Sequence, residues 1–363
     1  MADEGKKLSF LNVDHETIWG LLRVLCNSRA SDLLLVAGVQ PSLKINNELM
    51  RIDAPVLTAE LVETYARDLM NKNQLEAFKE TKDIDFAITD ENLGRFRINI
   101  YNQRNTISIA VRHIVEDIPS LEDLNLPAWL ESYALKSQGL ILVSGPNGHG
   151  KSTTLASMID IINTKRNKNI ITIEDPIEFL HSHKQSNVNQ REVGIDTESF
   201  HTGLRRIYRE APDVILIGEM RDRESISIAL EAAETGHLVL STLHANNSTL
   251  AINRIVDVFP AEHQPQIRLQ LADNLLLSFN QRLIKTRDDT DRLPAFEKLT
   301  NSYRVSTMIR DGRSHQIRTR LVSSDEYHSL DASLANLVKQ NKVHRDAAHH
   351  YAQDQKVFQD LLR

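Results

Sequence analysis

The sequence predicts an α/β protein with two domains, the larger of which contains a parallel sheet with helical crossovers. From about residue 128 onward, short runs rich in valine, isoleucine and leucine alternate with helical segments, as in a parallel sheet. A glycine-rich segment, residues 145–153, joins one such run to a helix. Before residue 113, helices mix with strands of alternating polarity, which predicts a smaller α+β domain.

The composition narrows the class of protein. The chain has 363 residues, of which 41% are hydrophobic and 25% charged, as in ordinary globular proteins. A net charge of -6 and only 5% aromatic residues argue against a nucleic-acid partner. No apolar stretch approaches the ~20 residues that span a bilayer. Cys26 is the single cysteine, which excludes an internal disulfide and a cysteine-based zinc module and fits a reducing cytoplasm.

The N-terminal domain, residues 1–112, is predicted from its hydrophobic periodicity. Thr58 is expected to cap a helix with Glu60 in its first turn, because hydroxyls cap helices and acids are favoured there. Asn46 and Asn47 are expected to form the turn of a hairpin. The predicted elements are a helix at 15–28, a strand at 30–38, the hairpin at 41–52, a helix at 58–70 and strands at 83–90 and 94–114.

A linker at 113–122, with little periodicity and Pro119 within it, is expected to lead into a second domain at 123–363. Its predicted strands are 139–145, 169–175, 213–219 and 237–245. After about residue 260 the pattern predicts a mostly helical C-terminal part, with helices at 265–284, 329–340 and 347–362.

The glycine-rich segment matches the phosphate-loop pattern G-x-x-x-x-G-K-[ST]. Its backbone N–H groups and the following helix dipole would bind phosphate oxygens. Lys151 would reach the terminal phosphates, and the Ser152 hydroxyl would bind Mg²⁺. The expected nucleotide-binding residues are Gly145, Pro146, Asn147, Gly148, His149, Gly150, Lys151, Ser152 and Thr153.

Acids and a histidine follow three further predicted strands. Glu219 ends an apolar strand, where it would hold the Mg²⁺ shell through water or polarise the attacking water. Glu174, Asp175 and Glu178 follow another strand, with structural ion pairing as the alternative. His237 precedes a strand and His244 follows it. His244 is expected to contact the γ-phosphate, with a purely structural role as the alternative.

These segments together resemble the secretion ATPases. "GPNGHGKSTT", "TIEDPIEF", "REAPDVILIGEMRD" and "AAETGHLVLSTLHANN" resemble their Walker A, Asp box, Walker B and His box. The likeness extends over nearly the whole chain and is strongest to the type IV pilus retraction ATPases, the PilT and PilU group. It implies a RecA-like P-loop ATPase domain behind a smaller PAS-like domain. It further implies a homohexamer that hydrolyses ATP with Mg²⁺ and powers pilus retraction for twitching motility.

The resemblance also implies roles for individual residues. Glu178 and Glu219 match the catalytic acids, and His237 and His244 match the His-box histidines. Arg97 and Arg112 match arginines that reach ATP across a domain interface, with solvated strand residues as the alternative. The family further implies a cytoplasmic location at the inner-membrane pilus machine, a membrane platform protein as partner, and a paralogous retraction or assembly ATPase as another.

The sequence differs from the family pattern at a few positions, and it leaves other functions open. Asn147 and His149 stand where the family usually has small hydroxyl residues or glycine. Near the C terminus Arg310 matches the retraction segment, but its alanine and asparagine are replaced. The alternatives are a pilus-assembly or secretion ATPase, which usually carries a four-cysteine zinc module, a RecA-like nucleic-acid motor, and a non-hydrolysing ring subunit.

Overall fold

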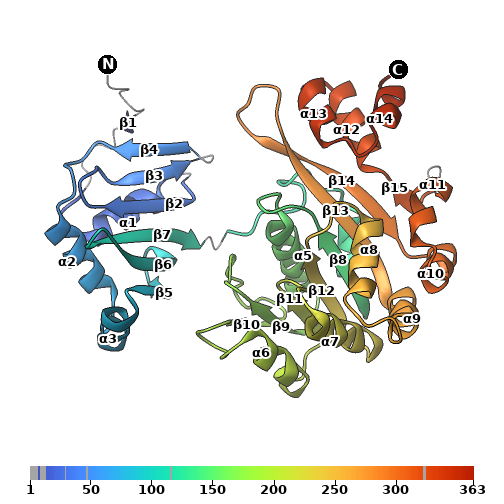
Figure 1. The fold of residues 1–363 in the computed structure, drawn as a ribbon, viewed down its shortest axis with the longest axis horizontal. Helices are drawn as coiled ribbons and strands as arrows, with labels where there is room; N and C mark the ends of the chain where they lie inside the picture. Colours follow the sequence, from blue (N-terminus) through green and yellow to red (C-terminus); the bar gives the residue numbers. More distant parts are fainter. Residues whose placement is uncertain (1–6, 9–13, 29, 46–47, 115–116, 322–323) are drawn as a thin grey trace. The chain divides into compact units, whose positions relative to one another are not determined.

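The structure, a computed structural model, describes residues 7–8, 14–28, 30–45, 48–114, 117–321 and 324–363. Its contacts divide the chain between residues 116 and 117 into two compact units, unit 1 and unit 2, each with its own sheet (Figure 1). The last strand of unit 1 ends at Ile114, two residues past the limit expected from the sequence. The expected limits 1–112 and 123–363 stay a prediction about folding units.

Unit 1 contains a seven-stranded sheet in the order β1-β4-β3-β2-β7-β6-β5, antiparallel except for the pair β1 and β4. Three helices accompany it, and the aliphatic residues of α1 and α2 form one core with the sheet. The strands are β1 (Lys7–Leu8), β2 (Asp32–Val36), β3 (Ser42–Ile45), β4 (Glu48–Ile52), β5 (Asp83–Asp90), β6 (Gly94–Gln103) and β7 (Thr106–Ile114). The helices are α1 (Ile18–Cys26), α2 (Ala59–Leu69) and α3 (Lys72–Thr81).

The local signals in unit 1 account for most of these elements. Thr58 caps α2 as predicted, since its side chain accepts a hydrogen bond from the Leu61 N–H. Helix α3 was not predicted, although Asn71 and Gln74 form a capping box at its start. The predicted Asn46–Asn47 turn lies outside the described residues, while the strands on either side of it form the expected hairpin.

Unit 2 contains an eight-stranded sheet in the order β10-β9-β11-β12-β8-β13-β14-β15. The six strands from β10 to β13 run parallel, β14 pairs antiparallel with β13, and β15 pairs antiparallel with β14. The strands are β8 (Gly139–Ser144), β9 (Asn169–Glu174), β10 (Asn187–Glu192), β11 (Val214–Ile217), β12 (Leu238–Leu243), β13 (Leu275–Lys285), β14 (Arg292–Thr300) and β15 (Tyr327–His328). This arrangement confirms the predicted α/β class.

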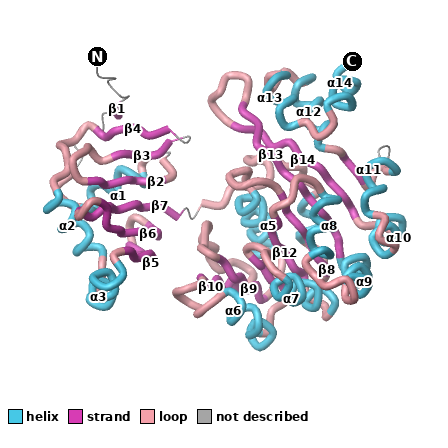
Figure 2. The backbone as a smooth tube through the Cα atoms, viewed as in Figure 1, coloured by secondary structure: helices cyan, strands magenta, loops and turns pink. Residues whose placement is uncertain are grey.

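Helices cover both faces of this sheet (Figure 2). Leu140 and Leu142 of β8 face one core, while Ile141 and Val143 face the other, so the strand is apolar throughout. The helices are α4 (Leu130–Ala134), α5 (Lys151–Lys165), α6 (Phe200–Arg206), α7 (Arg223–Glu234), α8 (Ser248–Asp257), α9 (Gln264–Asn274), α10 (Tyr303–Arg310), α11 (Ile317–Arg320), α12 (Leu330–Lys339), α13 (Arg345–Tyr351) and α14 (Gln355–Leu362).

The predicted helix at 265–284 is wrong in its second half. Helix α9 ends at Asn274, and β13 begins at Leu275 and pairs with both β8 and β14. A strand buried on both faces reads as a continuous apolar run, which periodicity does not distinguish from a buried helix. The C-terminal part is therefore helical only outside β13, β14 and β15.

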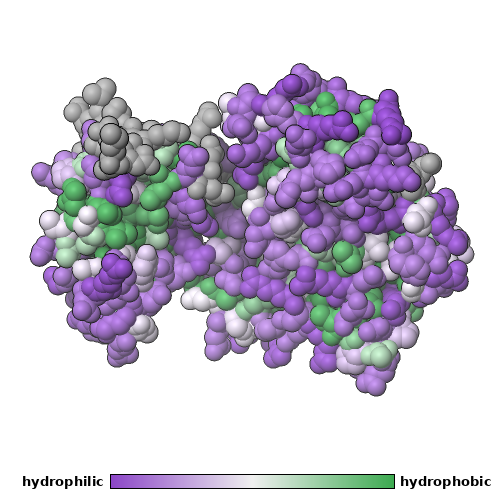
Figure 3. Space-filling model, turned by 45° about the horizontal axis from the view of Figure 1, so that its top comes forward, coloured by the Kyte–Doolittle hydropathy of each residue, from purple (hydrophilic) through white to green (hydrophobic). Residues whose placement is uncertain are grey.

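The face of the molecule seen in Figure 3 is mainly hydrophilic, with hydrophobic areas between the hydrophilic ones. Tyr303 at the start of α10 is the most exposed large hydrophobic side chain among the described residues, at 83%. Within the described ranges, no helix has the length and hydrophobicity needed to cross a membrane.

Candidate active site

The carboxyl ends of four parallel strands bring the predicted site residues of unit 2 to one edge of the sheet. The glycine loop follows β8, Glu174 ends β9, Glu219 follows β11 by two residues and His244 directly follows β12. Ligands bind at this edge in open parallel sheets. A cavity of about 410 Å³ lies there. Its polar lining includes Asn147, Lys151, Ser152, Glu174, Asp175, Glu178, Glu219, Arg221, Asp222 and His244.

The glycine loop has the backbone shape that a phosphate site needs. Gly145 and Gly150 have φ values of 149° and 79°, and a Cβ atom on either would meet Gln281 at 2.6 and 2.8 Å. Helix α5 begins at Lys151, and its N-cap is Gly150, which has no side chain to occupy the first N–H groups. These groups therefore remain for an anion, so the loop fits a nucleotide phosphate.

Lys151 lies across the mouth of this loop. Its Nζ donates to the Pro146 carbonyl at 2.9 Å, and the residue is only 8% exposed. Burial lowers the pKa of the Lys151 ammonium, and the charges of Glu219 and Glu178 partly oppose that effect. Pro146 and Asn147 line cavities on either side of the loop, and Ser152 and Thr153 continue into α5.

Both oxygens of the Glu219 carboxylate have a partner. Oε1 lies 2.8 Å from His244 Nε2, and Oε2 accepts from Arg221 Nε at 2.7 Å. Burial lowers the pKa of His244 even though Glu219 acts in the opposite direction. A neutral His244 can still donate from Nε2, because neutral imidazole carries one N–H. The acid is thus oriented from two sides.

The Asp-box acids occupy different environments. Burial raises the pKa of Glu174 to about 7, although Thr172 Oγ1 and Gln190 Nε2 donate to its Oε1 at 2.6 and 3.1 Å. Asp175 lies 4.0 Å from Arg221, while Glu178 is exposed at the rim of the cavity. Glu178 is therefore free of the burial that acts on Glu174.

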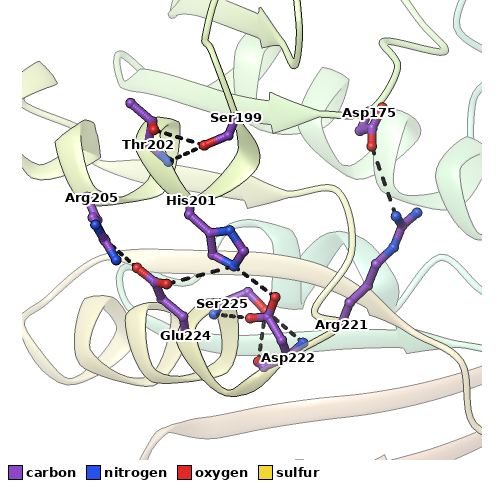
Figure 4. Close-up of polar contacts among 9 residues, drawn as sticks. All are labelled: Asp175, Ser199, His201, Thr202, Arg205, Arg221, Asp222, Glu224 and Ser225. Carbon is purple, nitrogen blue, oxygen red and sulfur yellow. Dashed lines mark hydrogen bonds and ion pairs between the residues drawn. The ribbon is translucent and has the colours of Figure 1, made fainter.

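Helices α6 and α7 extend the polar network beyond the predicted residues (Figure 4). His201 Nε2 lies 2.9 Å from Asp222 Oδ2 and 3.8 Å from Glu224. Asp222 also caps α7 by accepting from the Ser225 N–H. His201 and Arg221 were not among the predicted site residues. The charged pair Arg221 and Asp222, which follows Met220 in "GEMRD", is the signal that could have indicated Arg221.

His237 is not part of this group within the chain. It precedes β12, whereas His244 follows the strand, so the two lie roughly 20 Å apart at about 3.3 Å per residue. His237 Nδ1 instead lies 3.0 Å from the Ala232 carbonyl oxygen. A catalytic role for His237 therefore stays a prediction.

Arg97 and Arg112 belong to unit 1, where they face each other on β6 and β7. Arg97 pairs with Asp85, and Arg112 pairs with Asp32 at 2.9 Å. The Arg112 side chain is 57% exposed, whereas that of its partner Asp32 is only 14% exposed. Their predicted reach to ATP stays a prediction.

The residues present also fit Mg²⁺. Ser152 and Glu219 line the same cavity, and no cluster of three metal-ligating side chains was found in the described part of the chain. Mg²⁺ is commonly held by one or two protein groups, water and substrate phosphates, rather than by an all-protein cage. The donor set therefore suits a metal that arrives with the nucleotide.

Comparison with known proteins places the chain in a family. The profile of the family described as type II/IV secretion system protein matches residues 82–362. The chain is 40% identical over 333 residues to the type IV pilus ATPase PilU of Pseudomonas aeruginosa, covering 91% of this chain and 87% of that protein. It is 38% identical over 330 residues to the type IV pilus retraction ATPase PilT of the same organism, covering 90% and 96%.

A solved structure supports the same assignment. The crystal structure of the pilus retraction motor PilT with bound ADP matches with a TM-score of 0.89 at 38% identity. That match covers 95% of this chain and 99% of the PilT chain. The chain therefore belongs to the family of type II/IV secretion system proteins.

Proposed function

We propose that the chain is an ATPase whose hydrolysis of ATP powers the retraction of type IV pili. The similarity to the PilU and PilT ATPases, which runs over about nine tenths of both chains, carries this assignment. The cavity that gathers Lys151, Ser152, Glu178, Glu219 and His244 supports it independently.

The phosphate loop and Lys151 bind the β- and γ-phosphates of ATP in this mechanism. Ser152 and, through water, Glu219 hold Mg²⁺, which neutralises charge on the phosphates. Glu219 and Glu178 orient the attacking water, and His244, whose Nε2 lies 2.8 Å from Glu219 Oε1, holds Glu219 on the γ-phosphate side. Arg97 and Arg112 approach the phosphates from unit 1 of a neighbouring subunit, as arginine fingers do.

The partners follow from the same assignment. The chain forms a homohexameric ring at the cytoplasmic face of the inner membrane, where it contacts a platform protein of the pilus machine. A paralogous retraction or assembly ATPase is a second partner. Both statements extend the family resemblance to this chain.

Nucleotide binding and ATP hydrolysis by purified variants test the proposed catalytic roles. We expect Lys151→Ala to lose nucleotide binding, while Glu219→Gln retains binding and loses at least about 10²-fold in hydrolysis, since a positioned acid contributes about 10²–10⁴-fold. Glu262→Gln is the matched control, because Glu262 is an exposed acid of the same unit. If Glu219→Gln hydrolyses ATP within twofold of the wild type, the catalytic assignment is wrong.

The phenotype of a deletion strain distinguishes a retraction motor from an assembly or secretion motor. Loss of a retraction motor leaves pili on the surface without twitching, whereas loss of an assembly motor leaves no pili. We expect a deletion strain to carry surface pili and to regain twitching with the wild-type chain but not with Glu219→Gln. Bald cells would instead support the assembly alternative.

A further inference from the structure

His149 connects the phosphate loop to β13, the neighbour of β8 in the sheet. Its Nδ1 accepts a hydrogen bond from the Leu283 N–H of β13 at 2.9 Å. Its carbonyl oxygen accepts from Gln281 Nε2 at 3.0 Å, and the neighbouring Gly148 carbonyl accepts from Arg292 at 3.2 Å. The loop segment around His149 is thus anchored to both β13 and β14.

The edge of β13 explains why an acceptor is needed here. The pairing of β13 with β8 ends at Asn280 and Ser144, because the chain leaves β8 there and turns into the loop. Beyond that point the β13 edge that faced β8 has no strand partner, although β13 continues to Lys285. The imidazole of His149 supplies the acceptor that a strand carbonyl would supply in a longer sheet.

The positive charges around the His149 imidazole favour its neutral form, which can accept a hydrogen bond. Burial lowers the pKa of His149, and Arg282 of β13, Arg292 of β14 and Lys151 of α5 lower it further. Neutral imidazole has one acceptor nitrogen, whereas protonated imidazole has none. The Leu283 N–H bond therefore belongs to the neutral ring.

The C-terminal helices contact the same ring. Tyr351 of α13 meets the His149 imidazole edge to face, with ring centroids 5.8 Å apart. Two residues later, Gln353 Nε2 donates to the Asn246 carbonyl at 3.0 Å, in the loop that follows His244. Residues 351–353 thus contact the loops that follow the neighbouring strands β8 and β12.

We propose, building on the nucleotide site proposed above, that His149 is a positioning residue that braces the phosphate loop against β13 and α13. The contact sets how tightly the loop holds a nucleotide. The imidazole acts through the backbone of the loop and takes no part in the chemical step. The nucleotide affinity consequently depends on the C-terminal helices through Tyr351.

Nucleotide binding and steady-state hydrolysis by full-length variants test this role, with ADP and ATP as probes. His149→Ser introduces a small hydroxyl residue and removes the ring. We expect it to weaken ADP binding and raise KM for ATP by about three- to tenfold, the effect of one lost hydrogen bond, with kcat within about twofold. Tyr351→Leu is expected to weaken ADP binding by roughly twofold or more, because only the ring contact is lost.

The conservative variant separates positioning from general damage. In His149→Asn the side-chain oxygen can take the place of Nδ1, so we expect it to recover most of the loss seen in His149→Ser. His328→Asn is the matched control, since His328 is another half-buried histidine of unit 2 with a lowered pKa. It should leave KM unchanged.

Two results would overturn the role of His149. The first is a His149→Ser variant with the KM for ATP and the ADP affinity of the wild type. The second is a loss of ADP affinity in His149→Asn as large as that in His149→Ser. Lys151→Ala distinguishes this failure from a failure of the proposed site. If Lys151→Ala binds ADP like the wild type, the nucleotide site itself is wrong. If Lys151→Ala loses ADP while His149→Ser does not, only the brace is wrong.

Discussion

At the scale of single residues, two glutamates at neighbouring strand ends differ in their surroundings. Glu219 is held by His244 and Arg221, each of which can donate to an ionised carboxylate. Burial raises the pKa of Glu174 to about 7, and no cation is among the groups that shift it. The site therefore combines a glutamate whose two oxygens both have partners with a carboxyl group that is partly protonated at neutral pH.

This difference predicts how stability depends on pH. Because burial raises the pKa of Glu174 from 4.5 to about 7, its contribution is fully present below pH 4.5 and is lost as the pH rises through 7. We expect Glu174→Gln to be more stable than the wild type at pH 8, by on the order of 1–3 kcal/mol, and the difference to shrink towards pH 5. Thermal unfolding at several pH values measures this.

Tryptophan fluorescence isolates the relevant unit. Trp129 packs on Phe279 and Phe296 in unit 2, so a Trp19→Phe background reports unit 2 alone. Glu262→Gln, an exposed acid, should show no such pH-dependent difference. Equal stability of the Glu174→Gln variant and the wild type at every pH would show that this carboxyl group is not destabilised by burial.

At the scale of elements, β13 is the segment in which the structure differs most from the sequence-based prediction, since a helix was expected and a strand is observed. Its apolar half, from Leu275 to Phe279, is a buried strand that resembles a helix in sequence. Its polar half, Asn280 to Arg282, is buried because it lies along the phosphate loop. Polar residues in a buried strand have no local signal for their partners, some of which, such as Ser144 and Thr154, are more than 100 positions away.

The rest of unit 2 could be predicted because its signals are local. The loop spacing, the apolar strands and the acid after β11 each lie within about ten residues of sequence, and the structure brings them to one cavity. His201, Gln281 and Tyr351 could not be assigned, because their contacts depend on how the elements pack. His149 stood out in sequence only as a departure from the family pattern.

Asn280 provides the test of β13 as the support of the site. Its Nδ2 donates to Ser144 Oγ at 2.9 Å and to the Ala245 carbonyl at 2.8 Å, which joins the ends of β8 and β12. We expect Asn280→Leu to lower the free energy of unfolding of unit 2 by about 2–4 kcal/mol, because buried groups lose their partners. Denaturant unfolding followed by Trp129 fluorescence measures this.

A matched leucine substitution controls for this result. Asn189 is exposed on the edge strand β10, so we expect Asn189→Leu to change the free energy of unfolding by no more than about 1 kcal/mol. If the two substitutions cost the same, the Asn280 contacts do not hold these strand ends together.

At the scale of the whole molecule, the predicted catalytic groups are divided between the two units. Lys151, Glu219 and Glu178 line one cavity of unit 2, whereas Arg97 and Arg112 lie on the sheet of unit 1. Arg112 is exposed and pairs with Asp32 at 2.9 Å, a contact that a phosphate could replace. In a ring, one subunit would supply the loop and its neighbour the arginines.

Mixed mutants test whether sites are shared in this way. Lys151→Ala and Arg112→Ala are each expected to be inactive in ATP hydrolysis, since an arginine finger contributes about 10³-fold or more. Mixed under subunit exchange, they should recover part of the wild-type rate, because some interfaces then join an intact loop to an intact arginine.

A mixture of Lys151→Ala with Glu219→Gln is the control, since both residues line one cavity and no interface regains a complete site. Recovery in the first mixture alone would establish that Arg112 acts on a neighbour. No recovery, with exchange verified, would confine Arg112 to its own subunit or to its pair with Asp32.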